Sequence, residues 1–293
     1  MEHAAAHGET RTSRQGGPTL YVVATPIGNL SDISLRALEV LKTVDAIAAE
    51  DTRVTARLLE RYGIAKRLIS VHEHNEKRAI REVLEFLAAG RSLALACDAG
   101  TPAISDPGAL LVGAAKDAGF AVIPIPGPNA AVTAFSAAGF TAPHFLFYGF
   151  LPPRAGERRR ALAQVAALPY ALIFYETPHR IAACIADLRA TLGSERRIAI
   201  ARELTKVYET IHRCTIAEAD AWLAGDPDRS RGEFVLIVEG AQPPARGADE
   251  GAHRTLEILL GELPVRQAVA LAAKLTGGKR NELYKRALQL KKA

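Results

Sequence analysis

The chain has 293 residues, of which 24 % are charged and 48 % are hydrophobic, the composition of an ordinary soluble globular protein of about two domains. These proportions exclude a disordered, fibrous or disulfide-stapled protein. The three cysteines, Cys97, Cys184 and Cys214, lie far apart and form no C-x-x-C pair. A reducing compartment is therefore expected, and a structural zinc site is not.

The longest stretch without Asp, Glu, Lys or Arg runs from residue 118 to residue 153. It contains six prolines and four glycines, so it cannot form a single membrane helix. The first 18 residues are polar, lack the apolar run of a secretory signal and are expected to form a flexible arm. We therefore expect a cytoplasmic protein without a membrane partner.

The net charge is +5, and most of it belongs to one end of the chain. Residues 241–293 contain ten lysines or arginines against five acids, so the first 240 residues are close to neutral. Such a basic segment is either a solvated, charge-rich helical surface or a module that faces a polyanion.

The first half of the chain alternates short apolar strands with helices. Strands are predicted over residues 20–24, up to residue 51, over 93–97 and over 121–125. Ser31 and Asn75 are predicted to cap helices at their N-termini, and Gly63 and Gly90 to end helices. This alternation is typical of a parallel, doubly wound α/β sheet.

A second α/β unit follows in the sequence. Its apolar strands are predicted at residues 145–148, 171–175, 198–201, 207–213 and 234–239. The last two have fewer helices between them, which favours a mixed sheet. Helical patterns then cover residues 254–260, 265–275 and 279–290, with Pro264 as the first residue of the middle helix. The glycine turn and basic last helix suggest a helix-turn-helix, although small three-helix bundles give the same pattern.

The predicted fold class is thus α/β, with a parallel N-terminal sheet, a mixed second sheet and a small helical module. The predicted parts are a flexible arm at 1–18, an N-terminal α/β domain at 19–142, a second α/β domain at 143–240, a linker at 241–252 and a basic helix-turn-helix-like module at 253–293.

The loops after the predicted strands carry the candidate chemistry. No G-x-G-x-x-G follows the first strand and no Walker A motif occurs, which argues against dinucleotide and triphosphate sites. Three dense loops remain, at residues 50–53, 98–108 and 125–131. They contain prolines, glycines and acids, and they follow parallel strands, where ligands bind in open α/β sheets. Each could instead be a tight connection whose acids cap helices.

Together these segments resemble the tetrapyrrole methylase superfamily, and within it the branch that methylates a cytidine ribose 2′-oxygen in 16S rRNA. The similarity covers about residues 20–290. The matching segments are ATPIGNL at 24–30, AEDTR at 49–53, HNE at 74–76, DAGTP at 98–102, ISDPG at 104–108, PGP at 126–128, GFLP at 149–152, FYE at 174–176, ARELTK at 201–206 and GEFVL at 232–236.

The resemblance implies S-adenosylmethionine as cofactor, held between two α/β domains, usually in a homodimer. Residues 100–104 match a Gly-Asp-Pro-x-x segment that lies along the cofactor in relatives, with Thr101 where aspartate is frequent. The cofactor-binding residues that it implies are Pro26, Asp98, Gly100, Thr101, Ile104, Ser105, Asn129, Ala130, Tyr175, Ala201 and Leu204.

The implied reaction is an in-line methyl transfer to a ribose hydroxyl, without a covalent intermediate or a required metal. A base or a polarising cation near the hydroxyl would assist it. Glu176 and Lys206 are the preferred candidates because they follow strands of the second domain, and Glu50, Asp51, Asp98 and Glu203 are the others. His72 and His74 flank Glu73, but without a third ligand a metal site is not expected there.

The expected partner is 16S rRNA or the 30S subunit. Lys279, Arg280, Lys285 and Arg286 on the last helix are placed to meet its phosphates, while Leu283 and Leu288 are expected to pack inward. Two alternatives remain open: a methylase of a small tetrapyrrole, and a nucleic-acid-binding regulator that only senses a ligand.

Overall fold

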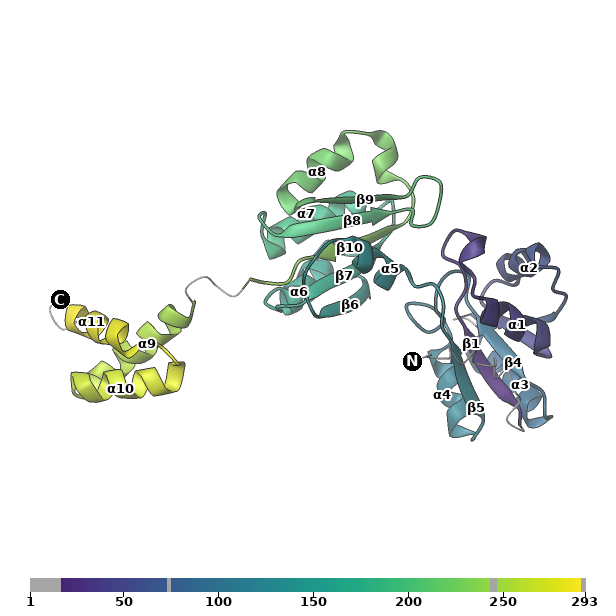
Figure 1. Ribbon diagram of the computed structural model, residues 1–293, viewed down its shortest axis with the longest axis horizontal. Helices are drawn as coiled ribbons and strands as arrows, with labels where there is room; N and C mark the ends of the chain where they lie inside the picture. The colour runs from purple at the N-terminus through teal and green to yellow at the C-terminus, as the bar shows by residue number, and fades with distance from the viewer. Residues whose placement is uncertain (1–16, 73–74, 243–246, 291–293) are drawn as a thin grey trace, which may run out of the picture. The chain divides into compact units, whose positions relative to one another are not determined.

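The computed structural model describes residues 17–72, 75–242 and 247–290. These form two compact units (Figure 1), of which the larger reaches residue 239 without 167–169, and the smaller comprises 167–169 and the chain from 240 onward. The larger unit contains two β-sheets and the smaller contains helices. The predicted fold class is confirmed. No helix in the described ranges is long and apolar enough to cross a membrane.

The first sheet is entirely parallel, in the order β3-β2-β4-β1-β5. Its strands are β1 (Thr19–Val23), β2 (Ala46–Ala49), β3 (Arg67–Ser70), β4 (Leu93–Ala96) and β5 (Ala121–Ile125). The helices between them are α1 (Leu35–Thr43), α2 (Thr52–Arg61), α3 (Glu76–Ala88) and α4 (Ala109–Asp117). Because β1 and β4 are neighbours, the loops that follow them start side by side.

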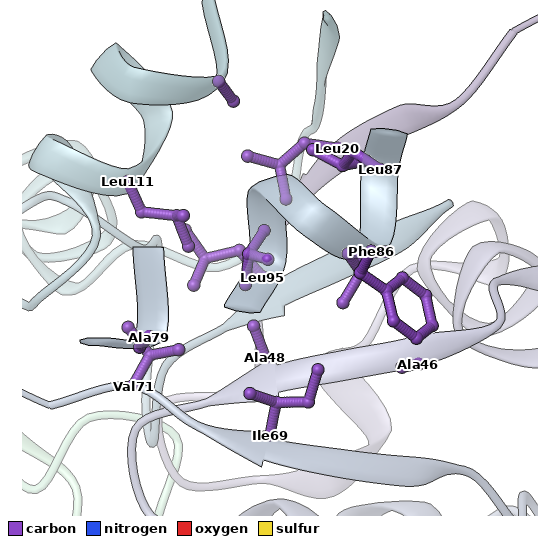
Figure 2. Packing of buried hydrophobic residues seen from close by; sticks show 13 residues of the cluster. Leu20, Ala46, Ala48, Ile69, Val71, Ala79, Phe86, Leu87, Leu95 and Leu111 are labelled. Atoms are coloured by element: carbon purple, nitrogen blue, oxygen red, sulfur yellow. The ribbon is translucent and has the colours of Figure 1, made fainter. Parts of the chain in front are cut away.

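Two hydrophobic cores hold this sheet, one on each face, because successive strand side chains point in opposite directions. On one face Leu20 and Leu95 pack with Phe86 and Leu87 of α3 and Leu111 of α4 (Figure 2). The other face packs against α1 and α2. Helices on both faces explain why the strands read as continuous apolar runs.

The second sheet is mixed, as predicted, in the order β6-β7-β10-β8-β9. Its strands are β6 (Phe145–Phe150), β7 (Ala171–Glu176), β8 (Arg197–Arg202), β9 (Thr210–Thr215) and β10 (Phe234–Val238), and its helices include α6 (Ala155–Val165), α7 (Ile181–Leu192) and α8 (Ile216–Ala224). Only β6 and β7 run parallel. The strand predicted at 207–213 begins three residues later, because residues 203–209 form turns closed by backbone hydrogen bonds.

Helix α5 (Ala130–Ala137) follows the last strand of the first sheet but packs on the second one. Ala131 and Ala134 lie in the same core as Ile173 of β7 and Ile237 of β10. The chain therefore passes from the first sheet to the second in the short segment before α5.

Of the predicted helix ends in the first sheet's half of the chain, Gly63 and Gly90 are confirmed and Ser31 is wrong. Ser31 does not cap α1, because residues 30–32 form a separate 3₁₀ turn and Ser34 accepts the hydrogen bond from the backbone of Ala37. Asn75 occupies the N-cap position of α3, but its side chain bonds to the preceding backbone instead. Gly63 and Gly90 adopt positive φ after α2 and α3, as predicted for glycines that end helices.

The smaller unit consists of α9 (Gly247–Glu262), α10 (Val265–Thr276) and α11 (Arg280–Leu290) around a small core. Helix α9 begins within the stretch predicted as linker, since Ala252 is fully buried in that core. Pro264 is the N-cap of α10 rather than its first residue. Leu288 is 44 % exposed, contrary to expectation, because helical spacing places Ala287 beside buried Leu283.

Candidate functional site

The loops after β1 and β4 are joined to each other at the carboxyl edge of the first sheet. The backbone N–H of Thr25 donates to the carbonyl of Gly100 at 2.7 Å, and the N–H of Gly100 donates back at 3.0 Å. The Thr25 hydroxyl donates to the carbonyl of Cys97 at 3.0 Å. These bonds fix the start of both loops as one surface.

The loop after β4 contains an unusual number of left-handed backbone conformations. Ala103 and Ser105 have φ of 69° and 64°, and Gly100 and Gly108 have φ of 88° and 125°. Non-glycine residues pay for this conformation in strain, and such strain concentrates at ligand sites. The strained segment therefore marks this loop as a candidate site on structural grounds.

A second loop, after β8, faces the same region from the other sheet. Its Lys206 ammonium lies 2.8 Å from Oε1 of Glu203 and 2.8 Å from Oε2 of Glu233. Burial would lower the pKa of Lys206, but the hydrogen bonds to Glu203 and Glu233 outweigh burial and raise it. The same contacts keep the pKa of Glu203 below its usual value, against the effect of burial. Lys206 is thus a fixed cation.

The loop after β1 touches the loop after β8 directly. The backbone N–H of Asn29 donates to the hydroxyl of Thr205 at 3.0 Å. A β-carbon added to Gly28 would lie 2.6 Å from Cγ of Lys206, so only glycine allows this approach.

The start of α5 closes another side. Asn129 caps the helix by accepting from the N–H of Val132 at 3.2 Å, and the N–H of Ala131 donates to the Tyr175 hydroxyl at 3.1 Å. The hydroxyl of Thr101 donates to the carbonyl of Pro128 at 3.2 Å. These hydrogen bonds hold the walls of the site together.

These segments enclose a cavity of about 200 Å³. Its lining is Ile27, Ala99, Gly100, Thr101, Ile104, Ser105, Asp106, Asn129, Ala130, Phe150, Tyr175, Glu176, Thr177, Leu204, Lys206, Glu233, Phe234 and Val235. Backbone groups, apolar side chains and a few charges in one concave site are typical of a small-molecule site.

Most of the predicted cofactor residues lie on this wall: Gly100, Thr101, Ile104, Ser105, Asn129, Ala130, Tyr175 and Leu204. Pro26 and Asp98 adjoin lining residues without lining the cavity themselves, and Ala201 is buried in the core of the second sheet. Of the preferred catalytic candidates, Glu176 and Lys206 both line the cavity, whereas Glu203 supports Lys206 from behind.

The other predicted acids have structural partners. Asp51 caps α2 and pairs with Arg53, and the Arg53 hydrogen bonds lower the pKa of Asp51 to about 2. Asp98 accepts from the N–H of Asp51 at 3.0 Å, and Glu50 accepts from the N–H of Asp98 at 3.4 Å. This group of acids thus ties the loops after β2 and β4 together.

Glu176 is fully buried, unlike an acid that exchanges protons with substrate. Its Oε1 lies 3.1 Å from Nε of Arg180 and accepts from the N–H of Thr177 at 2.8 Å. Arg180 in turn donates to the carbonyl of Leu151. The geometry therefore favours a positioning role for Glu176.

Asp106 is a charged lining residue that the sequence did not single out. It lies in the Ser-Asp-Pro-Gly segment that ends the strained loop, whose composition marked the loop but not this side chain. Burial raises its pKa to about 6, helped by the negative charges of Glu50 and Asp98. A cation bound next to Asp106 would favour the ionised form of this carboxyl. Phe150 and Glu233 were also missed.

No group of three His, Cys, Asp or Glu side chains that could hold a metal ion occurs among residues 17–72, 75–242 and 247–290. Glu73 and His74 lie outside the described residues. In the smaller unit, the predicted RNA-contacting residues Lys279, Arg280, Lys285 and Arg286 are all exposed.

Solved structures of methyltransferases share the fold of the larger unit. The methyltransferase CobJ aligns over 77 % of this chain and 95 % of its own, with a TM-score of 0.59 and 21 % sequence identity. The cobalt precorrin-4 methyltransferase CbiF aligns over 75 % of this chain and 94 % of its own, with a TM-score of 0.56 and 14 % identity. The fold of the larger unit is thus that of the tetrapyrrole methyltransferases.

Closer similarity is found among curated proteins named ribosomal RNA small subunit methyltransferase I. The one from Escherichia coli O157:H7 is 50 % identical over 270 residues, covering 92 % of this chain and 94 % of the relative. The one from Pseudomonas aeruginosa is 49 % identical over 273 residues, covering 92 % and 97 %. The chain belongs to the family of tetrapyrrole (corrin/porphyrin) methylases, whose model matches residues 19–220. Residues 245–291 match the RsmI C-terminal HTH domain.

Proposed function

We propose that this protein uses S-adenosylmethionine to methylate the 2′-oxygen of a cytidine ribose in 16S rRNA of the small ribosomal subunit. One observation carries the proposal: the similarity to the ribosomal RNA small subunit methyltransferases I runs through both the cavity-bearing unit and the C-terminal helices. A basic helical module has an evident use on a polyanion, and none on a small tetrapyrrole.

The cavity suits S-adenosylmethionine by its charge and its lining. When bound, the cofactor supplies a methyl group from a positively charged sulfonium. Asp106, with Glu50 and Asp98 behind it, provides negative potential in the cavity wall. The apolar side chains of Ile27 and Leu204 offer a slot for the adenine. We assign the cofactor to the eight predicted residues that line the cavity.

Lys206 is proposed to act on the nucleophile. In the transfer, a bond forms between the ribose 2′-oxygen and the methyl carbon, the sulfur–methyl bond breaks and the hydroxyl proton is lost to solvent. A fixed ammonium beside the 2′-oxygen stabilises the negative charge that develops there. Glu203 and Glu233 keep Lys206 protonated and oriented. Positioning of the two reactants supplies the larger share of the rate.

The C-terminal helices are proposed to bind rRNA through the exposed cations Lys279, Arg280, Lys285 and Arg286. We further propose that the protein works in the cytoplasm, where small subunits are assembled, and as a homodimer, the state that the family resemblance implies. We retain the predicted boundaries of the two α/β domains, 19–142 and 143–240, as part of this proposal.

The proposed function is tested by incubating the protein with labelled S-adenosylmethionine and 30S subunits that lack this methylation, then mapping the modified nucleotide. Label on a cytidine ribose of 16S rRNA is expected. Label on a porphyrinogen and not on the subunit would assign the protein to small tetrapyrroles. Binding of the cofactor without methylation of the subunit or of a porphyrinogen would favour the alternative of a regulator that only senses a ligand.

A further inference from the structure

Phe150 places a half-exposed aromatic ring at the wall of the cavity. It is the last residue of β6, an edge strand, and its ring is 49 % exposed although it lines the site. The preceding Gly149 has φ of 80° and lies at an irregularity in the β6–β7 register. Such irregularities re-aim the next side chain. A β-carbon on Gly149 would lie 2.9 Å from the Ser105 hydroxyl, so the strand end abuts the strained loop.

The Phe150 ring packs against Tyr175. Its centroid lies 5.6 Å from that of Tyr175 at an interplanar angle of 68°, and Phe147 supports Tyr175 from a centroid distance of 4.9 Å. This edge-to-face contact with Tyr175 orients the Phe150 ring while half of its surface still faces outward. A planar partner approaching from solvent therefore meets a prepared surface.

The backbone that follows Phe150 is also fixed. Arg180, itself paired with Glu176, donates to the carbonyl of Leu151. Arg158 donates to the carbonyl of Pro153 at 3.1 Å and pairs with Asp187 at 2.6 Å. Arginines that hold these carbonyls in place reduce the entropy lost when a ligand binds there.

Positive charge flanks this platform. Arg154, directly before α6, is 84 % exposed, and Arg159 and Arg160 on the first turns of α6 are also exposed. Glu157 on the first turn of α6 is half-buried and pairs with Arg154 at 3.4 Å, which leaves the exposed arginines of this segment in excess over acids. Arginines here attract phosphates and repel a cationic sulfonium cofactor, so the surface fits the nucleic acid rather than S-adenosylmethionine.

We propose that Phe150 stacks on an unpaired base of the RNA substrate while Arg154 and Arg160 contact neighbouring phosphates. This inference rests on the proposed function and adds an RNA-binding surface beside the cavity, separate in sequence from the C-terminal helices. An aromatic platform with cationic flanks is the general means by which proteins bind single-stranded nucleic acid.

The first experiment compares Phe150→Ala with Phe150→Tyr and with Phe145→Ala, a phenylalanine on the same strand that is 42 % exposed and does not line the cavity. Affinity is measured for a fluorescent single-stranded oligoribonucleotide, and KM for 30S subunits. Phe150→Ala should weaken both about tenfold, and Phe150→Tyr and Phe145→Ala should change them less than about twofold. The Kd for S-adenosylmethionine should stay unchanged in all three.

The second experiment tests the arginines with Arg154→Gln plus Arg160→Gln, against Arg81→Gln on α3 as control. The double variant should lower the salt dependence of oligonucleotide binding by about one to two log–log units, and the control should not. Unchanged RNA affinity of Phe150→Ala overturns the proposal, and so does a weaker S-adenosylmethionine Kd with normal RNA affinity. A change in sedimentation confined to Phe150→Ala would assign the ring to contact with a second copy instead. If the wild type bound RNA but methylated no subunit, the proposed methylation of 16S rRNA would be wrong and the RNA-binding surface at Phe150 would still be supported.

Discussion

Gly28 and Lys206 lie against each other although they belong to loops of different sheets. A β-carbon added to Gly28 would also lie 2.7 Å from the hydroxyl of Thr205 and 3.0 Å from the carbonyl oxygen of Leu204. The loop after β1 can therefore reach the cavity only because Gly28 has no side chain.

Replacing Gly28 with alanine should force these loops apart. We expect Gly28→Ala to lose about 1–3 kcal/mol of stability and most of its methyl transfer, because Lys206 would shift. Gly113→Ala is the matched control, since nothing lies within 4 Å of its added β-carbon in α4. The control should be neutral or stabilising in urea unfolding. Equal stability of the two variants would show that the contact tolerates a methyl group.

Asp106 should make the folded protein less stable as pH rises. Its folded pKa of about 6 exceeds the ordinary value of 3.8. Between these values the folded state holds more protons than the unfolded state, so stability falls as pH increases through the folded pKa, and the loss is complete at about pH 7. Asp106→Asn should thus match the wild type near pH 3.5 and exceed it at pH 7 to 8. Thermal unfolding over this range measures the difference, and identical curves at pH 7.5 would contradict it.

The same group should favour the charged cofactor over its uncharged-sulfur product. As Asp106 ionises between pH 5 and 7, the affinity for S-adenosylmethionine should rise roughly fivefold, because the sulfonium gains a negative neighbour. S-adenosylhomocysteine, which lacks that charge, should show a much flatter pH dependence. Calorimetry of both ligands tests this expectation, with Asp106→Asn as the variant in which the two curves run parallel. Parallel curves in the wild type would remove Asp106 from the sulfonium's surroundings.

Lys206 and Glu176 should fail in different ways. Lys206→Ala should lower kcat about tenfold to a hundredfold with little change in the Kd for S-adenosylmethionine, whereas Lys116→Ala, an exposed lysine of α4, should not. Glu176→Gln should cost roughly 3 kcal/mol of stability. It should also raise the KM for 30S subunits, because Arg180, which donates to the Leu151 carbonyl, loses its carboxylate partner. Near-normal turnover in both variants would leave neither residue with the proposed role.

The C-terminal helices should contribute affinity that depends on salt. Changing Lys279, Arg280, Lys285 and Arg286 to glutamine should reduce the salt dependence of subunit binding by up to about three log–log units, while cofactor binding stays intact. Deleting residues 247–293 should have the same direction of effect. Unchanged apparent affinity at every salt concentration would leave these helices without a role in substrate binding.

The sequence predicted four of the five strands of the first sheet, and β2 and β4 were recognisable because every residue in them is buried. It missed the edge strand β3, because Ile69 is the one fully buried residue among its four and leaves no apolar run. Ser31 misled because three polar residues, Asn29, Ser31 and Ser34, compete for the same helix start, and only backbone geometry selects Ser34. The start of α9 was not predicted, because glycines at 247 and 251 are typical of a linker. The burial of Ala252 stabilises this part of the helix.

For the site, motifs identified the loops but not the side chains that matter within them. The raised pKa of Asp106 comes from burial and from the charges of Glu50 and Asp98, an environment that arises only when separate strands come together. Phe150 reads as an ordinary strand residue, since the irregularity at Gly149 that re-aims it has no sequence period. Ala201 shows the reverse case, in which a matching motif residue lies in the core.

The position of β10 has a consequence for the order in which the protein is made. This strand lies between β7 and β8 in the sheet, and Glu233, Phe234 and Val235 at its start line the cavity. While the chain emerges from a ribosome, β7 and β8 have no common partner until β10 has left the exit tunnel. A nascent chain therefore lacks a complete cofactor pocket until nearly all of its larger unit has been synthesised, and a product truncated before β10 lacks this wall of the pocket.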